Sequence, residues 1–218
     1  MKTIVKKILG NLILLSIVGF LFASFLSFLK PVIISAQTFD SDEIEVTLNV
    51  DAGISIDSPG NITMSRNLSV INMTAVAEST WTVTTNNITG YNLTIKADTY
   101  PAMQQNATTT IADYPTGTPT TWSVINGANF GFSAYGTDVN TTTWGEGSSC
   151  STSTHNPSPT LKYLGFTTST SSPVVATRNA TTTFAGSATT ICYAVEQDNF
   201  FIPSGSYTAT ITATAVMI

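Results

Sequence analysis

Charged residues are scarce in this sequence, and basic residues are the scarcest of them. Asp, Glu, Lys and Arg together make up 10% of the 218 residues, against about 25% in average soluble domains. After residue 36 the only basic residues are Arg66, Lys96, Lys162 and Arg178. Nucleic acids and anionic lipid surfaces are bound through clustered Lys and Arg. The sequence therefore excludes a nucleic-acid-binding protein and an electrostatically bound membrane domain.

Histidine and the common catalytic motifs are also lacking. His155 is the only histidine, which is too few for a histidine-rich zinc site, and no HExxH or GxSxG motif occurs. The acids Asp40, Asp42 and Glu43 are close enough in sequence for a calcium site, but the EF-hand spacing is missing. A solvated acidic segment and a solvated loop histidine are the favoured interpretations. We expect no enzyme, no catalytic residue, no metal and no cofactor.

The long hydrophobic run of this chain lies at its N-terminus. Three lysines within the first seven residues precede an apolar stretch over 12–29, and a small residue, Ala36, ends the segment. This order is typical of a secretory signal peptide. An uncleaved membrane anchor is the alternative, because about 18 apolar residues can just span a bilayer. Both alternatives give two parts, an export segment at 1–36 and an extracellular or cell-surface domain at 37–218, with membrane contact only through the first part.

Beyond residue 36 the dominant pattern is alternation of apolar and polar residues. Examples are Trp81 with Val83, the odd-numbered residues of 91–97, and Ile191 with Tyr193 and Val195. Such alternation indicates antiparallel strands that bury one face. We expect an all-β fold, an antiparallel β-sandwich of the Ig-like or jelly-roll-like kind, after an N-terminal hydrophobic export helix. The strands are expected at 43–49, 68–76, 79–86, 90–97, 121–125, 129–135, 161–166, 173–184, 189–196 and 206–217.

Two long segments, 98–120 and 136–160, are rich in Thr, Gly, Pro and Ser and are expected to be loops, where recognition residues tend to lie. Cys150 and Cys192 are the only cysteines, and in an exported domain two cysteines most often form a disulfide. Trp144 and Tyr135 are the candidate ligand contacts, because an exposed aromatic side chain can stack on a sugar or a protein partner. The favoured interpretation of Trp144 itself is that it folds onto the edge of the sandwich.

Eight N-x-S/T sequons permit glycosylation without indicating it, because the chain is so rich in Asn, Ser and Thr. The favoured acceptors are Asn61, Asn106, Asn140 and Asn179. The others are Asn67, Asn72, Asn87 and Asn92.

Three stretches resemble bacterial cell-surface β-sandwich proteins, and the nearest family is that of the WxL-type wall-associated domains. The stretches are the run from Ser79 to Ile95, then Trp122-Ser-Val, then Tyr207-Thr-Ala-Thr-Ile-Thr-Ala. The family's Trp-x-Leu is Trp81-Thr-Val83 here and stands early in the domain. The resemblance implies a secreted, non-catalytic domain that attaches to peptidoglycan or to surface proteins.

Three functions follow as hypotheses. The first is a surface-exposed structural or adhesive module that binds cell-wall polysaccharide or a surface protein, other copies of itself included. The second is a fibre-forming or pilus-like subunit, in which the alternating strand at 207–218 completes a neighbour's sheet. The third is a secreted carbohydrate-binding module or hydrolase that uses Trp144, or an acid such as Asp138 or Glu146, in the 98–160 loops.

Overall fold

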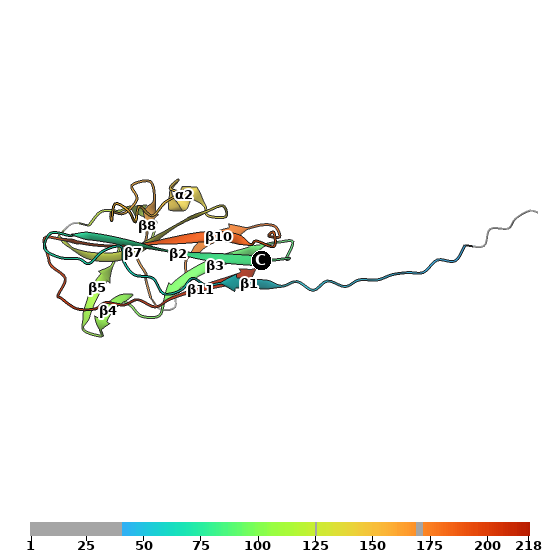
Figure 1. The fold of residues 1–218 in the computed structure, drawn as a ribbon, viewed down its shortest axis with the longest axis horizontal. Helices are drawn as coiled ribbons and strands as arrows, with labels where there is room; N and C mark the ends of the chain where they lie inside the picture. The colour runs from blue at the N-terminus through green and yellow to red at the C-terminus, as the bar shows by residue number, and fades with distance from the viewer. Residues whose placement is uncertain (1–40, 125, 169–171) are drawn as a thin grey trace, which may run out of the picture. The chain divides into compact units, whose positions relative to one another are not determined.

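The computed structural model of this chain describes residues 41–124, 126–168 and 172–218. Residues Asn49–Ile218 form one compact unit (Figure 1). The unit is all-β, with one short helix, α2 (Thr141–Trp144). Its strands are β1 (Ile54–Asp57), β2 (Thr74–Thr85), β3 (Tyr91–Ala97), β4 (Met103–Asn106), β5 (Thr109–Asp113), β6 (Thr120–Thr121), β7 (Gly127–Gly136), β8 (Lys162–Tyr163), β9 (Val174–Arg178), β10 (Ser187–Asp198) and β11 (Ile211–Met217).

The strands form one large and two smaller sheets. The large sheet has the order β1-β2-β10-β7-β5-β4, and its long central strands β2, β10 and β7 are antiparallel. The second sheet has the order β11-β3-β9, also antiparallel. The third consists of β6 and β8 alone. The C-terminal strand β11 is thus at the edge of its own sheet.

One hydrophobic cluster is shared by the inner faces of the two main sheets. The large sheet contributes Val83 from β2, Phe132 from β7 and Ile191 from β10, and the smaller sheet contributes Leu93 from β3 and Val175 from β9. The alternation read from the sequence predicts these faces correctly: the odd-numbered residues of 91–97 and of 191–195 are buried in this cluster. In β3 the alternate residues are only half-buried, so the period-two pattern marks its packed face directly. β10 is buried on both faces, and there the pattern marks the face that joins the shared core.

A second, smaller cluster lies on the outer face of the large sheet. Cys192 and Ala194 of β10 and Val76 of β2 contact Cys150, Leu161 and Tyr163, all from the polypeptide that follows β7. That polypeptide carries α2 and β8 (Figure 1). Both clusters and the Cys150–Cys192 disulfide lie within Asn49–Ile218, so this unit contains its own core.

Several sequence predictions are wrong or incomplete in detail. The expected strand at 43–49 is absent: residues 41–53 are extended but pair with no strand. The expected loop at 98–120 instead contains the short hairpin β4–β5. The strands expected at 121–125 and 161–166 shrink to the two-residue β6 and β8. Strand propensity alone does not make a strand, because the backbone also needs a neighbour to pair with.

The export segment predicted at 1–36 lies outside the described residues. Among the residues that are described, no helix is long and apolar enough to cross a membrane.

Candidate functional site

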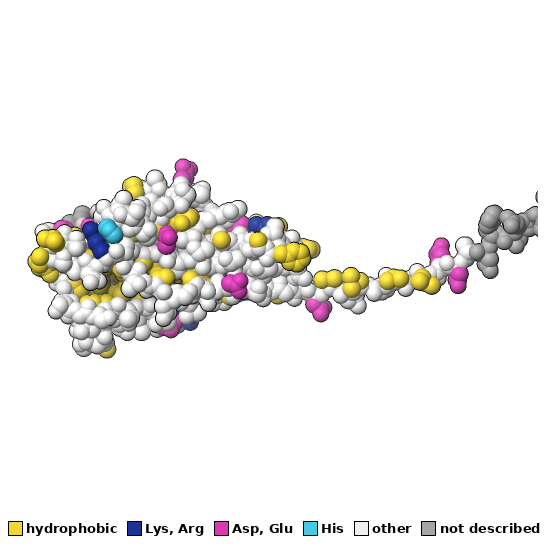
Figure 2. Space-filling model, in the orientation of Figure 1, with side chains coloured by type: hydrophobic (Ala, Val, Ile, Leu, Met, Phe, Trp, Pro, Cys, Tyr) yellow, Lys and Arg dark blue, Asp and Glu magenta, His cyan; other side chains and the backbone are white. Residues whose placement is uncertain are grey.

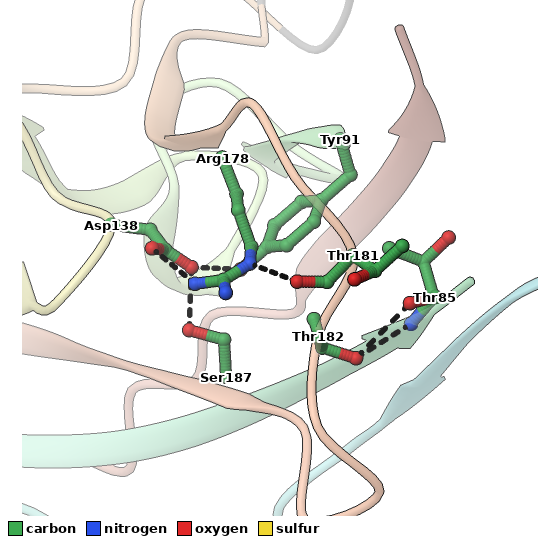
Figure 3. Close-up of polar contacts among 7 residues, drawn as sticks. All are labelled: Thr85, Tyr91, Asp138, Arg178, Thr181, Thr182 and Ser187. Carbon is green, nitrogen blue, oxygen red and sulfur yellow. Dashed lines mark hydrogen bonds and ion pairs between the residues drawn. The ribbon is translucent and has the colours of Figure 1, made fainter. Parts of the chain in front are cut away.

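A buried carboxylate, Asp138, is the centre of the main polar cluster in the fold (Figure 3). It follows β7, its side chain is only 7% exposed, and it forms an ion pair with Arg178 of β9 at 3.2 Å. The hydroxyl of Tyr91 on β3 donates a hydrogen bond to it at 2.9 Å, and the hydroxyl of Ser187 on β10 donates another. The cluster therefore connects the smaller sheet, through Tyr91 and Arg178, to the large sheet, through Ser187.

The contacts around this cluster are mutually satisfied. The Arg178 guanidinium also donates to the carbonyl of Thr181 at 2.8 Å, and Thr182 and the backbone of Thr85 are hydrogen-bonded to each other. Burial raises the pKa of the Tyr91 phenol to about 12, so this hydroxyl keeps its proton and stays a donor. A carboxylate with three donors has little capacity left for a substrate. The cluster is arranged as a structural link rather than as a reactive centre.

The two aromatic residues predicted as ligand contacts are not arranged as an exposed platform. Trp144 is 2% exposed and packs on Phe132, with ring centroids 5.4 Å apart. Of the two interpretations of Trp144, the structure shows the favoured one: the ring folds inward and joins the core cluster, because burying so large an apolar ring is strongly favourable. It is therefore not available as a ligand contact. Tyr135 is half-buried and packs against the outer-face cluster.

Beside α2 the surface has an open hollow of about 470 Å³. Of the two acids considered as active-site groups, Glu146 lines this hollow and is exposed, whereas Asp138 is committed to the buried cluster. Most of the lining is hydroxyl-bearing or apolar. The lining residues are Thr121, Thr141, Thr142, Gly145, Glu146, Pro159, Thr160, Leu161 and Lys162.

The predicted cysteine pair is present as a disulfide. Cys150 and Cys192 are 42 residues apart in the sequence, their Cα atoms are 5.2 Å apart, and both are buried. The bond fixes the polypeptide after β7 to the middle of β10. Because disulfides persist in oxidising compartments, it fits an extracellular environment.

Two further carboxyl groups are partly buried. Burial raises the pKa of Asp113, at the end of β5, to about 7, although its carboxylate accepts a hydrogen bond from the amide of Ala102. Burial also raises the pKa of Glu196, which accepts a hydrogen bond from the Trp122 indole. Sequence reasoning missed both groups, because their burial depends on the β4–β5 hairpin and on the packing of Trp122 against Tyr114.

The remaining predicted positions are dispersed. His155 is half-buried rather than solvated, and its backbone carbonyl accepts a hydrogen bond from Thr74 at 3.0 Å. Among the described residues, no three His, Cys, Asp or Glu side chains are grouped so as to hold a metal; Asp40 lies outside that range, and Asp42 and Glu43 are exposed. All four favoured glycosylation acceptors are exposed, and Asn140 also caps the N-terminus of α2 by accepting from the amides of Thr142 and Thr143.

The edge strand β11 presents a second kind of candidate site. Antiparallel neighbours exchange both backbone hydrogen bonds at every second residue pair. The amide of Asp98 donates to the carbonyl of Thr210 at 3.0 Å, and the amide of Ile218 donates to that of Gly90 at 3.2 Å. In the observed register, the backbone groups of the even-numbered residues 210–218 are therefore hydrogen-bonded to β3 and the residues that flank it.

The odd-numbered residues of β11 have the opposite orientation. The N–H and C=O groups of Ile211, Ala213, Ala215 and Met217 point away from β3. No described residue hydrogen-bonds to them there. Three of these residues turn half-buried side chains toward the shared core. The nearby strand β1 packs on the same core, but it is hydrogen-bonded to β2. The result is a free, partly apolar sheet edge seven residues long.

Comparison with known proteins adds no further assignment. No family model matches the chain, and neither a curated protein nor a solved structure does.

Proposed function

We propose that this chain is a non-catalytic structural module of an extracellular or cell-surface assembly, and that it joins a protein partner along the free edge of β11. The observation that carries the proposal is the row of backbone groups at the odd-numbered residues from Ile211 to Met217, to which no described residue hydrogen-bonds. An unprotected edge of this kind is a template for an added strand, and natural proteins use it for that purpose or block it. β11 has none of the usual blocks: no charged residue, no proline and no bulge against β3.

The rest of the fold supports a module built for rigidity. The two main sheets share one core, which fits the sandwich architecture of Ig-like or jelly-roll-like domains. The disulfide and the Asp138 cluster connect separate parts of this architecture. Export through residues 1–36 would place it in the oxidising environment that the disulfide requires.

Binding of a cell-wall polysaccharide is the second candidate. The observation that favours it is the hollow beside α2, in which the hydroxyls of Thr121, Thr142 and Thr160 are next to Lys162 and Glu146. Hydroxyl and charged groups on an open surface match the hydroxyl-rich chemistry of a polysaccharide. This site and the β11 edge involve different residues, so the two functions are separable by mutation.

Co-sedimentation of the oxidised chain, alone and with isolated cell-wall material, tests both candidates. The critical variant is Ala213→Pro, which removes an amide that points away from β3 and leaves the β3 hydrogen bonds in place. Thr214→Lys, a charge at an exposed position on the same strand, is the second variant in case the proline lowers the melting temperature.

Edge pairing predicts that the native chain sediments without wall material and that both variants stay in solution. A native chain that sediments alone, with both variants sedimenting equally, contradicts the use of the β11 edge. A native chain that stays in solution in both tubes contradicts a second copy as the partner. Sedimentation only with wall material, unchanged in both β11 variants, supports the polysaccharide candidate instead.

A further inference from the structure

The segment just before β1 has the sequence of a strand but pairs with no described strand. Residues 44–50 read Ile-Glu-Val-Thr-Leu-Asn-Val, and they are extended and unpaired. Every second residue of the segment is apolar, so these four side chains share one face of an extended chain. Their exposed fractions are 84% for Ile44, 84% for Val46, 82% for Leu48 and 73% for Val50. Figure 2 shows hydrophobic and acidic side chains along this segment. So regular an apolar face, fully in water, indicates a surface meant to be covered.

The free edge of β11 matches this segment in length and in pattern. Both are seven residues long, and both alternate with a period of two. On the core-facing side of β11, Ala213 and Ala215 are small and only half-buried. A strand added beside β11, with large apolar side chains on the same face, would bury the apolar surface that these two alanines leave partly exposed. The outward residues meet no like charge, because β11 carries no charged residue to oppose Glu43 or Glu45.

Hydrogen bonds fix the three residues between this segment and β1. The side chain of Asn86 accepts a hydrogen bond from the Gly53 amide at 2.6 Å and donates one to the Asp51 carbonyl at 2.8 Å. The Gly53 carbonyl accepts from the amide of Asn86 and from the hydroxyl of Thr85. These bonds hold residues 51–53 against the end of β2. Pairing of the segment with the β11 of its own chain would require a turn here, and a turn would break them.

We propose that residues 44–50 of one copy pair as an added strand with β11 of a second copy, with Ile44, Val46, Leu48 and Val50 facing that copy's core. The inference rests on the proposed use of the β11 edge and names its partner. The two surfaces are different parts of the chain, so the contact is heterologous: each copy offers a segment to one neighbour and an edge to another. Contacts of this kind produce open chains of subunits unless the rotation closes a ring.

The test compares two variants with the same change in charge on neighbouring residues of the segment. Leu48→Asp places a carboxylate on the apolar face, and Thr47→Asp places one on the opposite face. Both are made in the full chain. Leu48 is 82% exposed in the single copy, so neither variant is expected to change the melting temperature. We expect Leu48→Asp to weaken self-association at least about tenfold, and Thr47→Asp to weaken it by much less.

A cross-link between two copies identifies the partner strand directly. One preparation carries Thr47→Cys and a second, with a tag of different size, carries Thr214→Cys on the outward face of β11. The native cysteines are paired and buried, so only the introduced thiols react. The expected product on oxidation is a mixed disulfide dimer. Gln105→Cys, at an exposed position on β4, replaces Thr214→Cys as the control and is expected to give none.

The outcomes separate the inference from the proposal beneath it. Equal association of Leu48→Asp, Thr47→Asp and the native chain, with no mixed dimer, overturns the inference. If Ala213→Pro still abolishes association in that case, the β11 edge is in use and its occupant is a different strand. A native chain that remains a single copy at all concentrations overturns the inference as well.

Discussion

At the scale of single residues, polar side chains connect separate strands of the fold. Asp138 is the clearest case, because its carboxylate receives donors from β3, β9 and β10. Removing one partner of a buried charged group leaves the others without compensation, which costs more than the net value of any one hydrogen bond. The polar cluster is therefore a point at which the two main sheets can be separated by mutation.

We predict that Asp138→Ala lowers the free energy of unfolding by about 3 kcal/mol. The control is Asp57→Ala, because Asp57 is exposed on the edge strand β1 and its loss is expected to change stability by less than about 0.5 kcal/mol. Denaturant unfolding followed by tryptophan fluorescence measures both. Equal effects of the two substitutions would show that the Asp138 cluster does not connect the sheets.

The buried carboxyl of Asp113 predicts an unusual pH dependence. Burial raises its pKa to about 7, above the unfolded value of about 3.9, so the folded chain binds more protons than the unfolded chain between these values. Stability then falls as the pH rises from about 4 to about 7. The raised pKa of Glu196 acts in the same direction.

Thermal melting from pH 4 to pH 8 tests this expectation. Asp113→Asn removes the titrating group while keeping an acceptor for the Ala102 amide, so we expect its melting temperature to vary less with pH and to exceed that of the native chain at pH 8. Asp57→Asn is the matched control. An unchanged pH profile in Asp113→Asn would rule out a buried, protonated Asp113.

At the scale of elements, the sequence predicts the paired strands well and the unpaired or short ones poorly. The core-facing residues of β3 and β10 follow from alternation, since each strand turns every second side chain toward the shared core. The burial of the other face of β10 does not follow from it. The turn between β2 and β3 follows from the Asn-rich segment ending in Gly90, whose φ of +85° a glycine adopts most easily. The sequence does not show that this turn connects two different sheets and is therefore not a hairpin. Neither the β4–β5 hairpin nor the burial of Trp144 has a comparable local signal, because both depend on contacts with residues far away in the sequence.

The polar sites illustrate the same limit. Cys150 and Cys192 were predictable as a pair because the chain has no others. Asp138 could be named from the sequence only as an acid in a loop, since its partners Tyr91, Arg178 and Ser187 come from three different strands. No local pattern joins these four positions.

The disulfide gives a prediction at the scale of elements, because it attaches the α2 and β8 polypeptide to β10. In the chain-entropy model, a disulfide across a sequence separation of 42 lowers the entropy of the unfolded chain. This raises the free energy of the unfolded chain, and so stabilises the fold, by about 4 kcal/mol. We expect the double variant Cys150→Ala with Cys192→Ala to lose about this much stability in denaturant unfolding. The native chain measured under reducing conditions is the control and is expected to match the variant. A loss below about 1 kcal/mol in both would show that the outer layer is held by its packing alone.

At the scale of the whole molecule, the charge-poor surface and the free edge of β11 both favour association between copies. The face of the compact unit in Figure 2 is mostly uncharged, with few acidic or basic side chains. Like charges that would keep neighbouring copies apart are therefore sparse, and the β11 edge lacks the lysines and prolines that usually prevent strand addition. A chain of subunits, each contributing residues 44–50 to the next, is the arrangement that this account predicts.

The most direct test of the free edge is amide hydrogen exchange along β11, measured by NMR in the dispersed chain and in the assembly. In the dispersed chain we expect the amides of Thr212, Thr214 and Val216 to be protected by β3, and those of Ala213, Ala215 and Met217 to exchange rapidly. In the assembly all six are expected to be protected, because the added strand accepts from the second set. Protection of both sets in the dispersed chain, or rapid exchange of the odd-numbered amides in the assembly, would contradict the account.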